Sequence, residues 1–548
     1  MKDPSRGGLC LWVLLALCAP WSARAQSPKD AAFLSTLNEL REATYSDKEA
    51  IVKQLSQSGH SSVRAVLTAL MEDRLFFRNS DQKIFIVKSG DEDPLNLIDP
   101  LSLKSAGSAP ADGLTRIGTN NALRRELRET IARYSLSSPD AAVRLDAVRE
   151  ISRSLDEASV ALLRERLSVE TNAGVRKEIS ASLAMAALGS PDAGTRLKAV
   201  DTLKQSLSQD VRNRLALLLE KNPDGSFTES DARVRRAAAA AVATIDGWRA
   251  FYSGVQTLFF GLSLGSVLVL IAIGLAITFG VMGVINMAHG ELMMLGAYTT
   301  YCVQSLMPGH VGASILLAIP AAFLVAGLTG VIMERTIIQY LYGRPLETLL
   351  ATFGVSLILQ QSVRSIFTAL NRSVVTPDWM SGSLRLNDAL EITYNHLYVV
   401  IFTLIVFFLI LAIFKRTRIG LEIRAVSQNR AMAKAMGIRT EWVDAMTFGL
   451  GSGIAGVAGV ALSQLTNVGP NLGQSYIVDS FLVVVFGGVG NLWGSLLGGM
   501  GMGIVNKLLE PYAGAVLAKI FVLVALILFI QVRPRGLFPQ AGRAAEDK

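Results

Sequence analysis

The sequence has little of what soluble enzymes use for chemistry. Its 548 residues include three cysteines and four histidines, and the dipeptide Gly-Lys, which a P-loop requires, does not occur. Cys10, Cys18 and Cys302 all lie in apolar runs, so they cannot form a disulfide framework or a cysteine zinc site. No H-E-x-x-H motif is present either. We therefore expect neither an enzyme nor a bound metal or cofactor, and if ATP drives this protein, another subunit binds the ATP.

Charge is scarce in the second half of the chain. Of 53 Lys+Arg and 45 Asp+Glu residues, only 18 and 13 follow residue 249. No Asp, Glu, Lys or Arg lies between Arg249 and Glu291, a stretch about twice the roughly 20 residues of one membrane crossing. The net charge of +8 is too weak a field to suggest nucleic acid as a partner. The composition predicts a soluble first half and a membrane-embedded second half.

The N-terminus is typical of a secretory signal peptide. Lys2 and Arg6 precede an apolar core at 9–19, and Ala23 and Ala25 supply the small residues that signal peptidase needs. We predict a signal peptide over 1–25, so that the residues after it are exported. The alternative is an uncleaved anchor, but the apolar core is short for a membrane span.

Residues 26–246 have the apolar period of helices and are predicted to form an exported, periplasmic helical domain. A breaker-rich stretch at 79–122 interrupts them and contains a short β-like patch at 83–87. From residue 138 onward, an aspartate that starts a helix is followed four residues later by arginine. These arginines are Arg144, Arg196 and Arg235. The pattern favours either HEAT-type repeats, with the arginines at an exposed edge, or a plain amphipathic bundle.

Residues 250–540 are predicted to form a polytopic helical membrane domain of about eight or nine segments, which makes the whole chain all-α. Basic residues crowd the loop at 415–439, so this loop is cytoplasmic by the positive-inside rule. Five membrane spans are predicted before this loop. If the first of them starts outside the cell, the fifth ends in the cytoplasm, which agrees with the charge of the loop. The basic tail is also cytoplasmic if 477–509 forms two short crossings or a re-entrant pair, and the sequence leaves both possibilities open.

Two glycine-rich breaks in this domain are candidates for the translocation pathway. Non-helical backbone at membrane depth persists only where it is buried in protein or lines a watery cavity. The candidate kink and pathway residues are Asn286, His289, Gly290, Glu291, Gly487, Gly488 and Gly490. For His289 we favour a structural role that fixes the kink over a proton relay.

Two motifs in apolar spans look catalytic but lack the required context. They are G-x-S-x-G at 261–265 and G-x-G-x-x-G at 451–456. The first needs a strand-to-helix turn and the second a preceding strand. We interpret both as small residues spaced for close helix packing.

The run Asn-Met-Ala-His-Gly-Glu at 286–291, followed by Met-Leu-Gly-Ala-Tyr at 294–298, resembles the hallmark of permease subunits of branched-chain amino acid ABC importers. Segments at 448–459, 486–491 and 533–538 fit the same family in the same order. The basic loop is similar to the loop by which such permeases contact their ATPases. The resemblance assigns this coupling role to Gly420, Glu422, Arg424, Ala425, Ala433 and Gly437. We expect one short helix over 422–437, with Gly437 as its stop and Ala433 on the docking surface.

The exported extension resembles one branch of this family, the urea importer permeases of the UrtB type. It implies a bacterial inner-membrane protein whose cargo is urea. The implied partners are a second homologous permease subunit, two ATPase subunits that bind ATP, and a periplasmic substrate-binding protein. A branched-chain amino acid permease is the alternative, and a passive channel or facilitator is the alternative from a different class.

Overall fold

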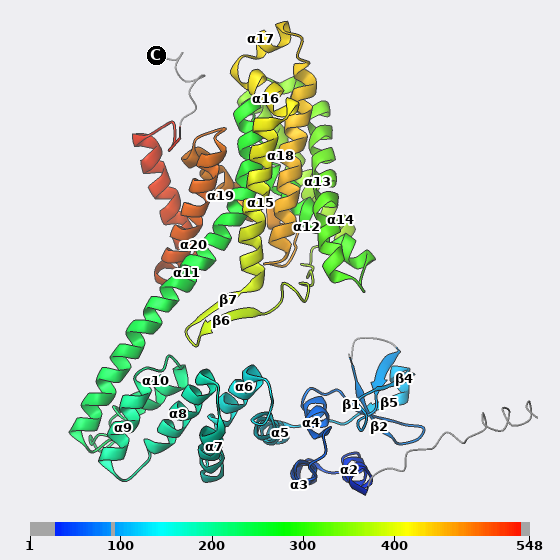
Figure 1. Cartoon of the computed structure of the whole chain (residues 1–548). Helices are drawn as coiled ribbons and strands as arrows, with labels where there is room; N and C mark the ends of the chain where they lie inside the picture. The colour runs from blue at the N-terminus through cyan, green and yellow to red at the C-terminus, as the bar shows by residue number, and fades with distance from the viewer. Residues whose placement is uncertain (1–27, 89–93, 539–548) are drawn as a thin grey trace, which may run out of the picture. The chain divides into compact units, whose positions relative to one another are not determined.

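The computed structural model describes residues 28–88 and 94–538, so the predicted signal peptide lies outside the described residues. The chain forms two compact units (Figure 1). The first unit comprises Met1–Ser206 and Asp210–Ala243, and the second comprises Leu207–Gln209 and Thr244–Lys548. Helices dominate both units, and we describe each by itself.

The first unit begins with three helices and a small antiparallel sheet of strand order β4-β3-β2-β1-β5. These elements are α2 (Pro28–Glu39), α3 (Tyr45–Gln57), α4 (Val63–Met71), β1 (Leu75–Arg78), β2 (Ile84–Val87), β3 (Leu95–Ile98), β4 (Ser105–Ala109), the 3-10 helix η1 (Ala111–Gly113) and β5 (Leu114–Arg116). The expectation of an all-α chain is therefore wrong for this region. The predicted β-like patch is the buried centre of the sheet, and the breaker-rich residues around it form the turns between strands of only three to five residues.

Six helices continue the first unit. They are α5 (Asn121–Ser135), α6 (Ala141–Ile151), α7 (Glu157–Val169), α8 (Ala173–Ala187), α9 (Ala193–Leu203) and α10 (Gln209–Leu217). Side chains of Asp140, Asp156, Asn172 and Asp192 accept hydrogen bonds from backbone N–H groups in the first turns of α6, α7, α8 and α9. Such caps satisfy otherwise unpaired donors at helix starts, which explains why these helices begin where they do.

Arg144 and Arg196 make the same set of contacts at equivalent places in α6 and α9. The Nη1 atom of Arg144 donates to the carbonyl oxygens of Ser138 and Pro139, both at 2.9 Å, while Nε and Nη2 bind Glu170 at 2.9 and 2.8 Å. Arg196 repeats this arrangement, with its Nε and Nη2 on Glu229. We call each arrangement an arginine clasp. The sequence placed these arginines at an exposed edge, but Arg144 is buried because a carboxylate from a later turn neutralises it.

The second unit consists mainly of long apolar helices. Its elements are the end of α11 (Ala232–Met282), α12 (His289–Leu306), α13 (Val311–Thr336), the 3-10 helix η2 (Ile338–Leu341), α14 (Pro345–Phe367), the hairpin β6 (Ser383–Asn387) and β7 (Leu390–Thr393), α15 (Tyr394–Arg416), α16 (Arg418–Gln428), α17 (Arg430–Ala435), α18 (Thr440–Ser463), α19 (Leu472–Gly487) and α20 (Leu492–Val532). Within the described residues, six of these helices are long and apolar enough to cross a membrane: α11, α13, α14, α15, α18 and α20. We call this part the membrane unit.

Glycines bring the helices of the membrane unit into backbone contact. A Cβ atom on Gly451 of α18 would lie 2.6 Å from the Gly274 carbonyl oxygen of α11, and one on Gly456 would lie 2.5 Å from that of Ala322. The second catalytic-looking motif is thus helix packing, as predicted. The same holds for the first, because a Cβ on Gly265 would lie 2.8 Å from the Gly499 carbonyl oxygen of α20.

Candidate functional site

The first predicted break is a non-helical stretch at 283–288, between the end of α11 and the start of α12. His289 is fully buried, and its Nε2 donates to the carbonyl oxygen of Ile271, 18 residues earlier in α11, at 3.1 Å. A Cβ on Gly274 would lie 2.9 Å from the same imidazole ring. The chain therefore turns back along α11 before α12 begins, and α12 starts beside the middle of the apolar part of α11.

The polar side chains of this break hold the turn. Asn286 is buried, and its Oδ1 accepts a hydrogen bond from the backbone N–H of Ala288 at 3.0 Å. The amide of Met287 donates to Thr352 Oγ1 of α14 at 3.1 Å. With His289 bonded to a backbone carbonyl, these contacts give the segment the geometry of a structural kink.

Glu291 faces a different neighbour. Its buried carboxylate accepts hydrogen bonds from Gln360 Nε2 at 2.7 Å and from Ser356 Oγ at 3.2 Å, both on α14. α14 therefore presents polar groups every fourth residue, at Thr352, Ser356, Gln360 and Arg364. This spacing is the sequence signal that identifies a polar stripe on an otherwise apolar helix.

Gly290 lies between these two sets of contacts. A Cβ on it would lie 2.5 Å from the Gly473 carbonyl oxygen in the first turn of α19. The start of α12 and the start of α19 therefore pack backbone to backbone, and no larger residue fits at this crossing.

The second predicted break joins α19 to α20. Gly488 and Gly490 have φ values of 100° and 79°, a left-handed region that suits glycine. A Cβ on Gly487 would collide with the backbone of Gly494, and a Cβ on Gly280 would lie 2.5 Å from the Gly490 Cα. The ends of α11 and α19 thus meet at this break.

The chain's C-terminal tail closes the second break. The backbone N–H of Leu537 donates to the carbonyl oxygen of Phe486 at 2.8 Å, and that of Phe538 donates to Gly487 at 3.2 Å. A Cβ on Gly488 would contact the backbone of Phe538. The sequence did not reveal that the tail at 533–538 and the break at 486–491 form one element.

The basic loop forms two helices instead of the single helix predicted over 422–437. α16 begins at Arg418, with the Thr417 hydroxyl accepting from the Gly420 N–H at 3.2 Å, and Asn429 both ends α16 and caps α17. Gly420 permits the tight corner after α15, because a Cβ there would lie 2.6 Å from the Phe414 Cα. Gly437 has a φ of 86° just after α17, so the predicted glycine stop is confirmed.

The predicted coupling residues do not share one face. Glu422 pairs with Arg418 at 3.0 Å, and Arg424 is exposed. Ala433 is buried in a cluster with Ile423, half-buried Ala425 and other apolar residues of α16 and α18. Placing Ala433 on the docking surface was therefore wrong, since this residue packs inside the protein.

Arg430 ties α17 to α18, a role that the sequence did not reveal. Its guanidinium makes an ion pair with the buried Asp444 of α18 and lies 4.2 Å from the ring centroid of Tyr342. The side chain of Asp444 is only 1% exposed, so its charge depends on Arg430 for compensation. The sequence signal was Asp444, an acidic residue in the second turn of an apolar helix.

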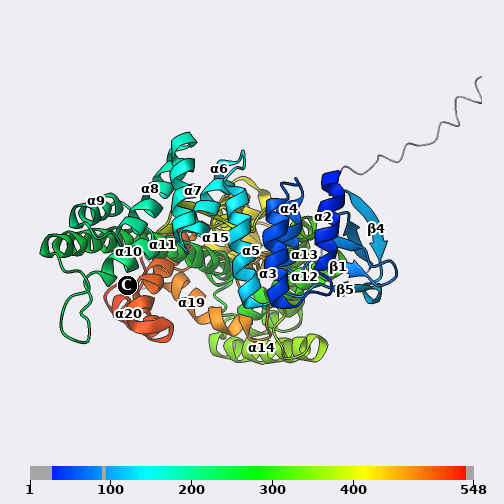
Figure 2. The same cartoon turned by 90° about the horizontal axis from the view of Figure 1, so that it is seen from below.

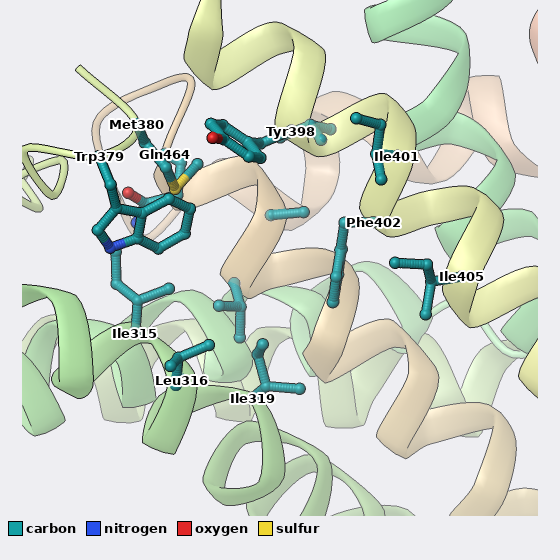
Figure 3. A pocket seen from close by; sticks show the side chains of 13 residues that line it. Ile315, Leu316, Ile319, Trp379, Met380, Tyr398, Ile401, Phe402, Ile405 and Gln464 are labelled. Carbon is teal, nitrogen blue, oxygen red and sulfur yellow. The ribbon is translucent and has the colours of Figure 1, made fainter.

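One pocket of about 200 Å³ lies between α13, α15 and α18 (Figure 3). Its labelled lining is mostly apolar, including Ile315, Trp379 and Phe402, with Gln464 among few polar members. An apolar pocket does not suit a polar solute, so we look for a translocation path on other surfaces of the membrane unit.

The family profile described as "Branched-chain amino acid transport system / permease component" matches residues 257–532. The chain belongs to this permease family. It is 31% identical to the high-affinity branched-chain amino acid transport system permease protein LivH of Salmonella typhimurium, over 54% of this chain and 97% of the relative. It is 29% identical to the high-affinity branched-chain amino acid transport system permease protein BraD of Pseudomonas aeruginosa, over 54% of this chain and 98% of BraD. The ribose import permease protein RbsC of Haemophilus influenzae is 25% identical, over 45% and 74%. No solved structure matches significantly.

The permease family match covers both breaks and the α16–α17 loop. Residues 28–243 lie outside it, and LivH is matched almost completely by about half of this chain. The first unit is therefore additional to the family's permease core. Within the described residues, no group of three or more His, Cys, Asp or Glu side chains is arranged to hold a metal ion.

Proposed function

We propose that this protein is the permease subunit of an ABC importer in the bacterial inner membrane. Separate ATPase subunits power it, a second homologous permease subunit completes the membrane passage, and a periplasmic binding protein delivers the cargo. The first unit is exported, and its two arginine clasps fit a short HEAT-like repeat array. Family membership supports the permease role.

The observation that carries this proposal is the surface of α16 and α17. Three large apolar side chains there are strongly exposed outside the apolar spans: Leu421 (60%), Met432 (59%) and Met436 (77%). Exposed apolar clusters of this kind mark protein interaction sites. Because Arg430 and the Ile423–Ala433 cluster fix both helices to the bundle, a partner seated here can move the membrane helices.

We propose nine membrane segments: α11, α12, α13, α14, α15, α18, α19 and two from α20. Helix α20 counts as two because its backbone leaves the helical conformation at Gly514, after Pro511. Together with the predicted signal peptide and the basic α16–α17 loop, this count supports a first unit outside the cell, with α16–α17 and the tail in the cytoplasm. A cysteine placed at Ser226 should react with an impermeant thiol reagent in intact spheroplasts, whereas one at Ser427 should not. The opposite pattern would reverse the topology and remove the importer proposal.

We propose urea as the cargo. The additional first unit and its resemblance to the urea branch support this choice. Branched-chain amino acids are the second candidate, because LivH and BraD are named for their transport. Deleting the gene should abolish radiolabelled urea uptake at low concentration and leave leucine uptake intact. Loss of leucine uptake with normal urea uptake would assign the protein to the second candidate.

A further inference from the structure

A lysine and an aspartate meet between two apolar helices of the membrane unit. Lys519 Nζ of α20 lies 2.9 Å from Asp479 Oδ2 of α19 and donates to the Ser475 carbonyl oxygen at 3.4 Å. The Asp479 side chain is 14% exposed, whereas that of Lys519 is 50% exposed. Neither residue belongs to the breaks or to the coupling loop.

The pair lies within the apolar helices, about 10 Å along α19 from its start at Leu472 and about 8 Å along α20 from the break at Gly514. One turn further along each helix, Val483 and Val522 pack in one cluster with Leu268 and Ala272 of α11. At 1.5 Å per residue, Leu268 is about 24 Å along α11 from Tyr252, and Ala272 is about 15 Å from its end at Met282. Both distances place this cluster well inside a bilayer with a hydrocarbon core about 30 Å thick.

The surface beside the pair is polar. Asn471, Gln474 and Ser475 are exposed at helical spacing along the start of α19, and Arg364 of α14 donates to Asn471 Oδ1 at 2.6 Å. In Figure 2, α14, α19 and α20 follow one another along one side of the membrane unit. We call the residues that these helices contribute the polar band: Arg364, Asn471, Gln474, Ser475, Asp479 and Lys519.

Lipid does not cover such a surface. A half-exposed ammonium group within a membrane-spanning segment is costly against hydrocarbon, and charged residues in such segments almost always face water or protein. The other exposed residues of the same stretch of α20 are apolar. Leu517 and Phe521 lie about 160° around the helix from Lys519, and Val516, which is 74% exposed, lies about 60° from it. Lys519 is therefore the one charged position on an otherwise apolar, lipid-compatible stretch of α20 at 515–530.

We infer that the polar band lines a water-filled passage and that Asp479 and Lys519 bind the solute that passes. The inference rests on the permease role proposed above. The ammonium group of Lys519 donates to a carbonyl or carboxylate oxygen, and the Asp479 carboxylate accepts from an adjacent N–H group. The pair is neutral as a whole, so it suits a small solute that carries N–H donors beside an oxygen acceptor, as urea and amino acids do.

Cysteine accessibility in the assembled importer tests the passage. In a background with the native cysteines replaced by alanine, Lys519→Cys is compared with Leu517→Cys, whose native side chain is 51% exposed and points about 160° away. Because a thiol reacts as the thiolate, which needs water, an impermeant methanethiosulfonate reagent should modify Lys519→Cys roughly tenfold faster or more. Equally slow modification at both positions would overturn the passage, whatever the cargo is.

Uptake by reconstituted importer tests solute binding. The neutral double variant Asp479→Asn with Lys519→Met avoids an unpaired charge and should keep normal abundance and ATPase co-purification, while uptake falls roughly tenfold or more because two charged hydrogen-bond partners are lost. Normal uptake by this variant would refute the binding role. Protection of Lys519→Cys by urea or by leucine identifies the solute. Failure of wild-type protein to transport either one would refute the cargo proposal but leave the labelling result standing.

Discussion

Replacing Glu170 should destabilise the first unit far more than removing a neighbouring carboxylate. The Glu170 side chain is fully buried and accepts hydrogen bonds from Arg144, from Arg166 at 2.9 Å, and from the backbone N–H of Asn172 at 2.9 Å. Glu170→Ala leaves Arg144 buried without its counter-charge, and breaking such a pair costs about 3–5 kcal/mol. For a unit of roughly 200 residues this lowers the melting temperature by on the order of 10 °C.

The measurement is pulse proteolysis of the full-length protein in detergent, with fragments of the first unit followed by immunoblot. The matched control is Glu165→Ala, which removes an exposed carboxylate from α7, the helix that ends directly before Glu170. Surface substitutions of this kind change stability by within about 0.5 kcal/mol. Equal, small effects of the two substitutions would refute the idea that the arginine clasp stabilises the unit.

Three further predictions concern the pH dependence of stability, the turn at Gly437 after α17, and the ion pair that anchors α17. Hydrogen bonds from Arg144 lower the pKa of Glu170 from an ordinary value of 4.5 to about 2. The contribution of Glu170 to stability is therefore complete above pH 4.5 and is lost as the pH falls through 2. Measuring the unfolding midpoint across an acid titration tests this prediction. Gly437→Asp strains a backbone with φ of 86° and should reduce ATPase co-purification with normal membrane abundance, whereas unchanged co-purification would assign the turn a purely topological role. Arg430→Met should loosen α17 and expose it to proteolysis, with the exposed Arg424→Met as the control that should not.

The helical parts of the chain were predictable because their signals are local. The apolar period, the capping residues and the scarcity of charge predicted the long spans. The glycine at position 437 predicted a helix end, and its φ of 86° is a conformation that favours glycine. The five-stranded sheet was missed, apart from one patch, since strands of three to five residues with intervening turn residues carry too short a pattern. Whether such a segment pairs depends on partners elsewhere in the chain.

The positions of individual side chains were less predictable, because distant residues decide them. Arg144 looked like a surface arginine until Glu170, 26 residues later, supplied its counter-charge. Ala433 looked suited to docking, but the turn at Asn429 directs it into the cluster around Ile423. The kink at His289 was predictable as a polar run among glycines. The position along α11 where His289 packs depends on its hydrogen bond to the Ile271 carbonyl oxygen, which no local pattern indicates.

The contacts of α18 connect the α16–α17 loop to the helix that carries Glu291. Arg430 anchors α17 to Asp444 at the start of α18. Further along α18, a Cβ on Gly456 or Gly459 would collide with backbone of α13 or α12, so the three helices touch without intervening side chains. Close-packed backbones move as one body rather than deform. If an ATPase binds α17 as proposed, a load on α17 would reach α12, which carries Glu291, through the single helix α18. Arg430→Met would remove the first contact of this chain and leave the glycine contacts intact.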